Sequence, residues 1–208
     1  MNNFAITGAD KACINLPSSA DAMIFEGTMT NCNTDGESWG GAIVNYPGST
    51  GGMLHVENVT IENAYVNLID TDLQHVTVSN VSATITSGST QTGTVLTSDF
   101  GVASEVKMFN FDAPDYSSAS INALGVINMT EVDFGSADMT IAPGGSSSTA
   151  NGPSGDNAVM DDVTVGDMLV YRMQPSVMTD VTAGHIDFSG NAITVSYTHL
   201  RAHETSEY

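Results

Sequence analysis

The sequence of 208 residues has few basic residues, few cysteines, few prolines and no long hydrophobic run. Four Lys and Arg residues stand against 24 Asp and Glu residues, which gives a formal net charge of −20. A surface with this charge repels nucleic acid phosphates and anionic lipid headgroups, so we expect neither as a partner. No run of about eighteen apolar residues occurs, so we expect no segment inserted in a membrane.

Cysteine is represented only by Cys13 and Cys32. Two small buried side chains and a disulfide are both compatible with this pair, and the sequence leaves the two alternatives open. No basic-plus-apolar signal segment follows Met1, although the composition is typical of extracellular proteins. We therefore expect a secreted or cell-surface protein whose signal sequence is not part of this stretch.

The polarity of the chain comes from uncharged residues, since only 13% of the residues are charged and 41% are apolar. Thr, Ser, Asn, Gly and Asp favour strands and turns, and they are poor helix formers. No window carries a sustained apolar stripe at helical spacing. The composition therefore predicts an all-β fold.

One eight-residue phrase occurs twice within Val56–Asn80, as VENVTIEN at Val56–Asn63 and LQHVTVSN at Leu73–Asn80. Its fourth and sixth places are apolar and its fifth place is polar, which predicts a strand with one buried face. The phrase recurs at Ile24–Asn31, Val106–Ala113, Met129–Ser136, Met160–Asp167 and Met178–His185. The predicted inward pairs are Val59/Ile61, Val76/Val78, Phe109/Phe111, Val132/Phe134 and Val163/Val165.

A strand that returns after only 17 or 18 residues leaves too little chain for a βαβ crossover. Such a return fits a coil in which successive strands stack in parallel at about 4.8 Å. Second strands are predicted at Ala42–Val44, Val66–Ile69, Val95–Leu96, Leu124–Ile127, Leu169–Tyr171 and Ala192–Thr194. Longer spacings predict loop insertions near 33–52, 87–93 and 143–155.

The recurrent V-x-x-N-V-T-like phrase resembles the right-handed parallel β-helix repeat family, the solenoid of pectate-lyase-like enzymes and many surface proteins. The resemblance covers about residues 4–194, and it implies a right-handed coil. The alternative fold is a β-sandwich with a turn every 8–12 residues or so.

The end of the chain has a different character. Val195–Thr205 (VSYTHLRAHET) resembles the translation of a transposase end sequence used in preparing sequencing libraries. We therefore expect residues 195–208 to be a non-native, adapter-derived tail, and the β-helix to be truncated after Thr194.

Three acidic residues, Glu131, Asp162 and Asp180, occupy the third place of the last three phrases. On consecutive coils they would stack in one column, where a Ca²⁺ ion would relieve their repulsion. The alternative is an acidic face in contact with solvent. Trp39 and Tyr46 could stack on a sugar ring or simply cover the edge of the coil.

Short segments at Asn33–Gly36, Asp161–Asp162 and Gly184–His185 resemble parts of the polygalacturonase active site. The resemblance is incomplete, because Asp35 and Asp161 are 126 residues apart and the basic tripeptide that holds the substrate is missing. We therefore predict a structural or adhesive role, with polysaccharide or cell-surface components as partners. The alternative is a carbohydrate-active lyase or hydrolase whose catalytic coils are missing or degenerate.

Overall fold

A computed structural model describes residues 1–45, 51–86, 94–97, 103–121, 123–142, 157–173, 176–189, 195–198 and 201–202. In the parts of the chain so described, the secondary structure consists of strands and turns without a helix, which confirms the all-β prediction. It follows that these residues include no helix able to span a lipid bilayer.

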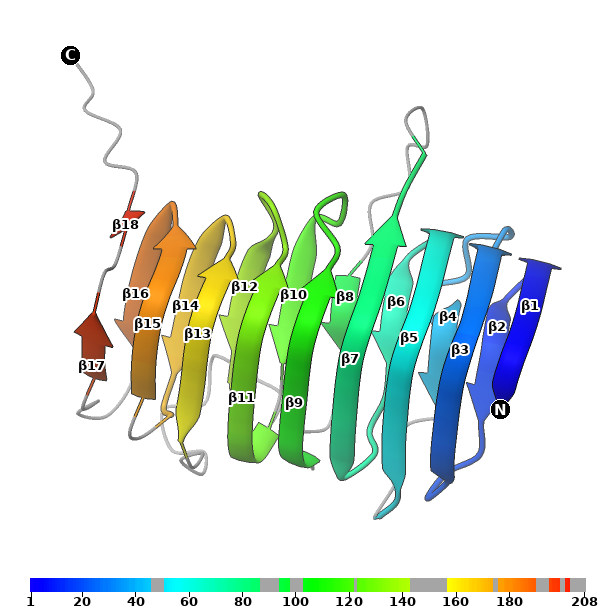
Figure 1. Cartoon of the computed structure of the whole chain (residues 1–208), viewed down its shortest axis with the longest axis horizontal. Coiled ribbons are helices and arrows are strands. Elements are labelled where there is room, and N and C mark those ends of the chain that lie inside the picture. The colour runs from blue at the N-terminus through cyan, green and yellow to red at the C-terminus, as the bar shows by residue number, and fades with distance from the viewer. Residues whose placement is uncertain are drawn as a thin grey trace.

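The strands alternate along the chain between two parallel sheets (Figure 1). The odd-strand sheet contains β1 (Asn2–Ala9), β3 (Asp21–Cys32), β5 (Met53–Ala64), β7 (His75–Thr84), β9 (Ala103–Asp112), β11 (Ala123–Asp133), β13 (Ala158–Thr164), β15 (Ser176–Ala183) and β17 (Val195–Thr198), with β18 (Arg201–Ala202) also paired to β15. The even-strand sheet contains β2 (Ala12–Leu16), β4 (Gly41–Asn45), β6 (Asn67–Asp70), β8 (Thr94–Thr97), β10 (Ser118–Ile121), β12 (Asp138–Ile141), β14 (Asp167–Tyr171) and β16 (His185–Ser189).

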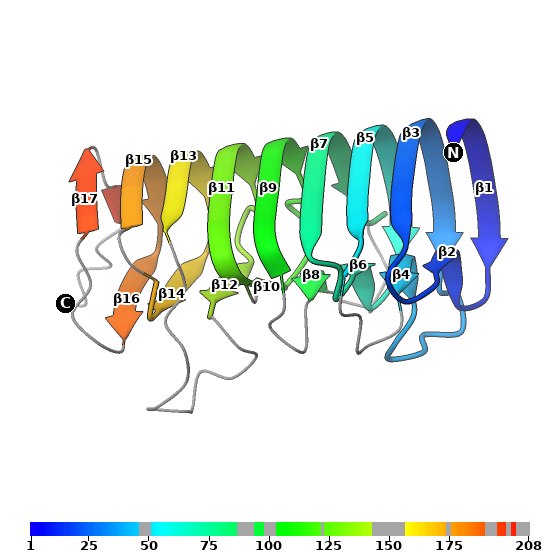
Figure 2. The same cartoon turned by 90° about the horizontal axis from the view of Figure 1, so that it is seen from below.

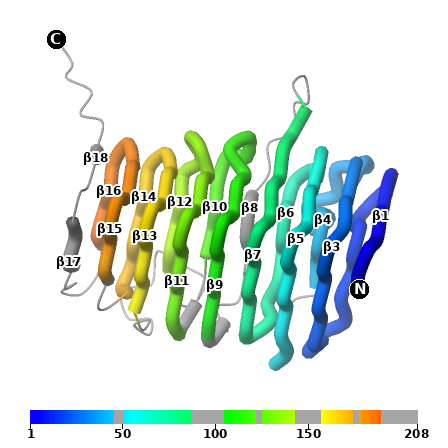
Figure 3. Tube along the Cα trace, in the orientation of Figure 1, coloured from blue at the N-terminus to red at the C-terminus, as the bar shows by residue number. Residues whose placement is uncertain are grey.

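Each strand pairs with the next strand of its own sheet, and the pairings of the described strands are all parallel. The Cα trace therefore advances from the N-terminal end of the row to the C-terminal end, one layer at a time (Figure 3). Thr60, Thr77, Thr164 and Thr182 all lie in the odd-strand sheet on strands of the same direction. The described strands thus do not form the antiparallel sheets of the alternative β-sandwich.

Figure 2 shows the odd and even strands in two separate layers. The core consists of apolar side chains from both sheets, stacked in columns. One column contains Ile24, Val56, Val78, Met108, Met129, Met160 and Met178, each at most 2% exposed. The predicted inward pairs are buried, with the exception of Phe109, which is half-buried on the outer face.

Each long odd strand contains one residue with a positive φ at the same level of the stack. These residues have φ between 47° and 56° and are Asn3, Glu26, Asn58, Asn80, Asn110, Glu131, Asp162 and Asp180, which we call the bend column. The residue has no partner in the ladder, since Phe25 pairs with Glu57 and Gly27 pairs with Val59. Asn and Asp tolerate this left-handed conformation better than most residues, and the extra residue bends the strand.

In the middle of the chain, the observed register of the strands differs from the predicted register. Val56 pairs with Val78, which lies 22 residues later, and not with Leu73. Val106 pairs with Val76 and Ile127, so the predicted alignments of its phrase were also wrong. The alignment of Ile24–Asn31 with Val56–Asn63 is confirmed, as is the alignment of the last three phrases.

The second strands are found at four of the predicted places, in β4, β6, β8 and β14. The prediction at Leu124–Ile127 was wrong, because these residues belong to β11 of the odd-strand sheet. The even strand at that level is β10, whose sequence SASI has no apolar run and buries only Ala119 and Ile121. Ala192–Thr194 and the predicted loops 87–93 and 143–155 lie outside the described residues.

Gly27 stands at an inward place of the bend, where the other phrases carry a larger apolar residue. The ring of Phe4 in the preceding strand fills the space, and a Cβ atom added to Gly27 would overlap it. The first phrase therefore keeps a packed core despite its glycine, because a neighbouring strand supplies the missing volume.

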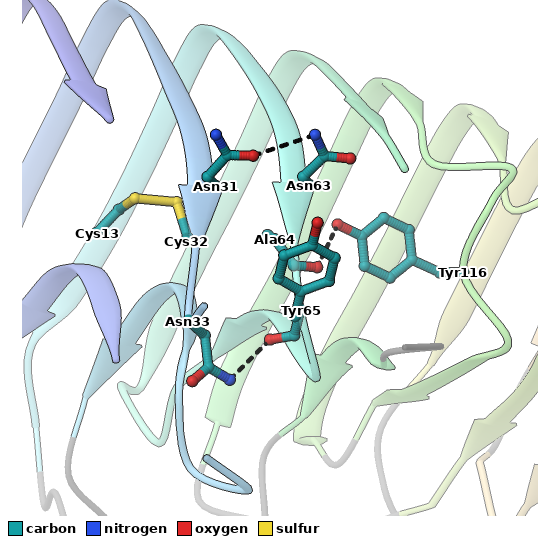
Figure 4. Close-up of a disulfide and its surroundings, with 8 residues drawn as sticks. All are labelled: Cys13, Asn31, Cys32, Asn33, Asn63, Ala64, Tyr65 and Tyr116. Atoms are coloured by element: carbon teal, nitrogen blue, oxygen red, sulfur yellow. Dashed lines mark hydrogen bonds between the residues drawn. A yellow bond between two sulfur atoms is a disulfide. The ribbon is translucent and has the colours of Figure 1, made fainter. Parts of the chain in front are cut away.

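A disulfide joins Cys13 of β2 to Cys32 at the end of β3, with a Cα–Cα distance of 5.2 Å (Figure 4). The structure thus decides between the two alternatives that the sequence left open. The bond connects the even-strand sheet to the odd-strand sheet at the N-terminal end. At the other end, the predicted adapter-derived tail contributes β17 and β18, and its origin stays a prediction.

Candidate functional site

The bend column carries a row of hydrogen-bonded amides on the outer face of the odd-strand sheet. Asn110 Nδ2 donates to Asn80 Oδ1 at 2.9 Å, and Asn80 Nδ2 donates to Asn58 Oδ1 at 3.1 Å. We call these three residues the amide row. Since each Nδ2 has two hydrogens and gives at most one to the row, each residue keeps at least one N–H for another acceptor.

A second pair of amides lies nearer the strand ends. Asn63 Nδ2 donates to Asn31 Oδ1 at 3.2 Å (Figure 4). Thr86 N donates to Asn63 Oδ1 at 2.7 Å. Asn31 and Asn63, which end two of the aligned phrases, therefore stack on neighbouring strands. Asn80, which the sequence placed with them, belongs instead to the amide row.

The bend column continues beyond the amide row with Glu131, Asp162 and Asp180 on β11, β13 and β15. The structure thus places the three predicted calcium ligands at one level of consecutive strands. Within the described ranges, however, no three His, Cys, Asp or Glu side chains are grouped closely enough to hold a metal ion. The calcium site stays a prediction, and a melting midpoint that does not move in millimolar calcium would discard it.

A shallow groove runs along the bend column, across the strands of the odd-strand sheet. On each strand, the residue of the bend column forms one wall of the groove. The buried residue after it forms the floor, and the outward-pointing residue after that forms the other wall. The first section has a volume of about 380 Å³ and is lined by Asn58, Val59, Thr60, Asn80, Val81, Ser82, Asn110 and Asp112. The second has a volume of about 410 Å³ and is lined by Asn110, Phe111, Asp112, Glu131, Val132, Asp133, Asp162 and Thr164.

The two sections share Asn110 and Asp112, so they form one groove whose chemistry changes along its length. The section over β5, β7 and β9 presents three amides and two hydroxyl groups, with the Asp112 carboxylate at its β9 end. The section over β9, β11 and β13 presents four carboxylates, on Asp112, Glu131, Asp133 and Asp162. The amide wall and the pairing of Asp112 with Asp133 could not be predicted from the sequence, because they depend on the correct register of β5, β7, β9 and β11.

Asp112 and Asp133 are register partners on neighbouring parallel strands. Partial burial raises the pKa of Asp112, and the charges of Asp133 and Asp115 raise this pKa further. Asp133 is held by a hydrogen bond in which Gly135 N donates to its Oδ1 at 2.7 Å. In this pair, therefore, Asp112 retains its proton to a higher pH than an ordinary Asp, and the carboxylate of Asp133 is held in place by a hydrogen bond.

The raised pKa of Asp112 predicts how the stability of the protein depends on pH. The folded protein binds the Asp112 proton more tightly than the unfolded chain, so this residue favours folding at low pH and opposes it above its folded pKa. We expect Asp112→Asn to raise the melting midpoint by about 2–4 °C at pH 7, since it relieves up to about 1 kcal/mol of repulsion. Below the pKa of an ordinary Asp, the gain should disappear.

Glu62→Gln provides a matched control for this measurement. Glu62 points outward from β5, and its register partners Thr30 and Thr84 carry no charge. The control changes the net charge by the same amount as Asp112→Asn, so melting both variants between pH 3 and pH 8 separates local repulsion from overall charge. Equal shifts in the two variants would contradict the proposed repulsion at Asp112.

Trp39 is 39% exposed, and Lys11 Nζ lies 4.8 Å from the centroid of its ring. A cation–π contact therefore occupies one side of the side chain predicted to stack on a sugar. Tyr46, the other residue of that prediction, lies outside the described residues. Sugar stacking at Trp39 and Tyr46 thus stays a prediction.

Asn33, in the segment similar to part of the polygalacturonase site, is a fully buried structural residue. Its Nδ2 donates to Tyr65 O at 2.9 Å (Figure 4). The same Nδ2 donates to Glu37 O at 2.8 Å, and its Oδ1 accepts from Glu37 N at 2.9 Å. The other two segments do not join it. Asp35 follows β3 and Asp161 lies in β13, five strands away in the sheet, or about 24 Å.

No protein-family model, curated protein or solved structure matches this chain. The case for a function therefore depends on the fold and on the groove.

Proposed function

We propose that this chain is a section of a right-handed parallel β-helix with a structural or adhesive role on the outside of a cell. The observation that supports it best is the alternation of strands between two parallel sheets in regular register. A β-helix is quasi-one-dimensional, because each coil contacts only its neighbours, and it presents a long outer surface with a repeated chemistry. That property suits a stalk or an adhesive face.

Two further observations support an extracellular setting. The Cys13–Cys32 disulfide is of the kind that persists in oxidising compartments. The net charge of −20 favours solubility of a protein outside the cell, and it repels acidic polymers. The partners that fit are polysaccharides or other cell-surface components without a high negative charge.

Adhesion can be tested with beads that carry the purified, oxidised chain. We expect the beads to be retained on at least one surface in a panel of immobilised cell-wall polysaccharides, without release of sugar reducing ends. Retention on none of the surfaces would contradict the adhesive role.

The second candidate is a carbohydrate-active enzyme, and the Asp112–Asp133 pair is the observation that favours it. A pair of carboxyl groups with different proton affinities is the machinery of glycoside hydrolysis. Release of reducing ends from any polysaccharide in the panel, abolished by Asp133→Asn, would favour the enzyme over the adhesive protein.

A further inference from the structure

We propose that the amide section of the groove, over β5, β7 and β9, binds a neutral β-linked glycan chain with one sugar unit per strand. This inference rests on the proposed adhesive function and names its ligand. It concerns the amide section alone, which the Asp112 carboxylate closes at β9.

The hydrogen-bonding groups of this section suit a chain rich in hydroxyl groups. The amide row supplies N–H donors on one wall, and Thr60 and Ser82 supply hydroxyl groups on the other wall. All five side chains belong to exposed residues, so none has to be uncovered before it binds. Amides and hydroxyl groups together can both donate to and accept from a sugar hydroxyl.

The spacing of these groups favours a glycan over a peptide. Neighbouring strands are about 4.8 Å apart, and one amide recurs at that interval on β5, β7 and β9. Opposite the amides, β5 and β7 each carry a hydroxyl group and β9 carries the Asp112 carboxylate. A sugar unit in an extended β-linked chain has a similar length, so each successive sugar would meet one amide of the row. An extended peptide advances about 3.3 Å per residue and does not stay in register with the strands.

The charge of the groove excludes acidic glycans. Asp112 closes the amide section, and Glu131, Asp133 and Asp162 follow it. In the described part of the groove lining there is no Lys or Arg to balance a uronate or a sulfate. An acidic polymer would therefore be repelled from the end of the section, while a neutral one would not.

Affinity electrophoresis and calorimetry with defined oligosaccharides test this proposal. We expect neutral β-1,4-linked glucose or mannose oligomers to bind, with affinity rising up to about three sugars for the three strands and then levelling off. Oligogalacturonates of the same length should bind at least tenfold more weakly. Absence of binding by the neutral oligomers, or equal binding of the acidic ones, would overturn the proposal.

Variants locate the site. Asn80→Gly removes the central amide while Gly keeps the positive φ of 51° without strain, and it should weaken binding at least tenfold. Thr60→Val removes a hydroxyl group from the other wall without touching the amide row, and it should weaken binding by a few-fold. Ser79→Ala, one residue before Asn80 and outside the groove lining, is the control and should bind normally.

The results also separate this inference from the proposed function. If the beads adhere to a polysaccharide surface and neither Asn80→Gly nor Thr60→Val reduces the retention, the adhesive role stands and the amide section is not its site. If the beads adhere to nothing, the adhesive role itself fails. Binding of an extended basic peptide in place of any sugar would overturn the glycan proposal.

Discussion

Phe111→Ala is expected to destabilise the protein by about 3–5 kcal/mol, whereas Phe109→Ala should cost less than about 1 kcal/mol. Phe111 is 1% exposed, and its ring centroid lies 5.8 Å from that of Phe134 in the core. Phe109 lies on the outer face, because Asn110 has a positive φ of 47° and interrupts the alternation. Truncating the inward ring leaves a cavity, and truncating the outward ring does not.

The two variants are a matched pair, since the same side chain is shortened two residues apart on one strand. Chemical denaturation measures both free energies of unfolding, and circular dichroism checks that each variant keeps its strands. Equal losses in the two variants would mean that both rings point inward. That result would remove the bend at Asn110, and with it the groove.

Loss of the Cys13–Cys32 disulfide is expected to destabilise the N-terminal strands by about 3 kcal/mol. The bond closes a loop with a sequence separation of 19 residues and restricts the unfolded chain. Because each strand pairs with its neighbours in the sheet, the effect should stay near β1–β4 rather than extend along the whole row of strands. Hydrogen exchange of the double variant Cys13→Ala/Cys32→Ala should therefore accelerate in those strands and remain unchanged in β11–β15.

Reduction of the unmodified chain provides the control for side-chain effects. Cys32 is fully buried, so its replacement by Ala also removes a packed sulfur atom. If loop closure is the main contribution, the reduced protein and the double variant should exchange at similar rates. Two free thiols in the denatured, unreduced protein would contradict the disulfide itself.

The bend column explains which parts of the register could be predicted from the sequence. Asn58 and Asn63 both have a positive φ and lie five residues apart on β5. The two phrases were matched by placing Asn80 opposite Asn63, although it stacks on Asn58. The error of five residues is the distance between these two asparagines, which look alike in the sequence.

The groove, too, could be predicted from the sequence only where the phrases align. The acidic column of Glu131, Asp162 and Asp180 could be predicted because the last three phrases align by sequence alone, as the pairing of β11, β13 and β15 confirms. The amide row could not be found, since its members occupy different places in the misaligned phrases. The pairing of Asp112 with Asp133 could not be predicted for the same reason, since their phrases were misaligned.

The sequence by itself determined that this chain forms strands, and which residues of most strands face the core, because alternation of apolar and polar residues is a local property. Only the tertiary structure decided the register of β5, β7, β9 and β11, the pairing of the cysteines and the existence of the groove. These depend on distances between residues that lie far apart in the sequence and on a backbone bend that consumes one residue per strand. The alternation of apolar and polar residues within a single segment specifies neither these distances nor the position of the bend.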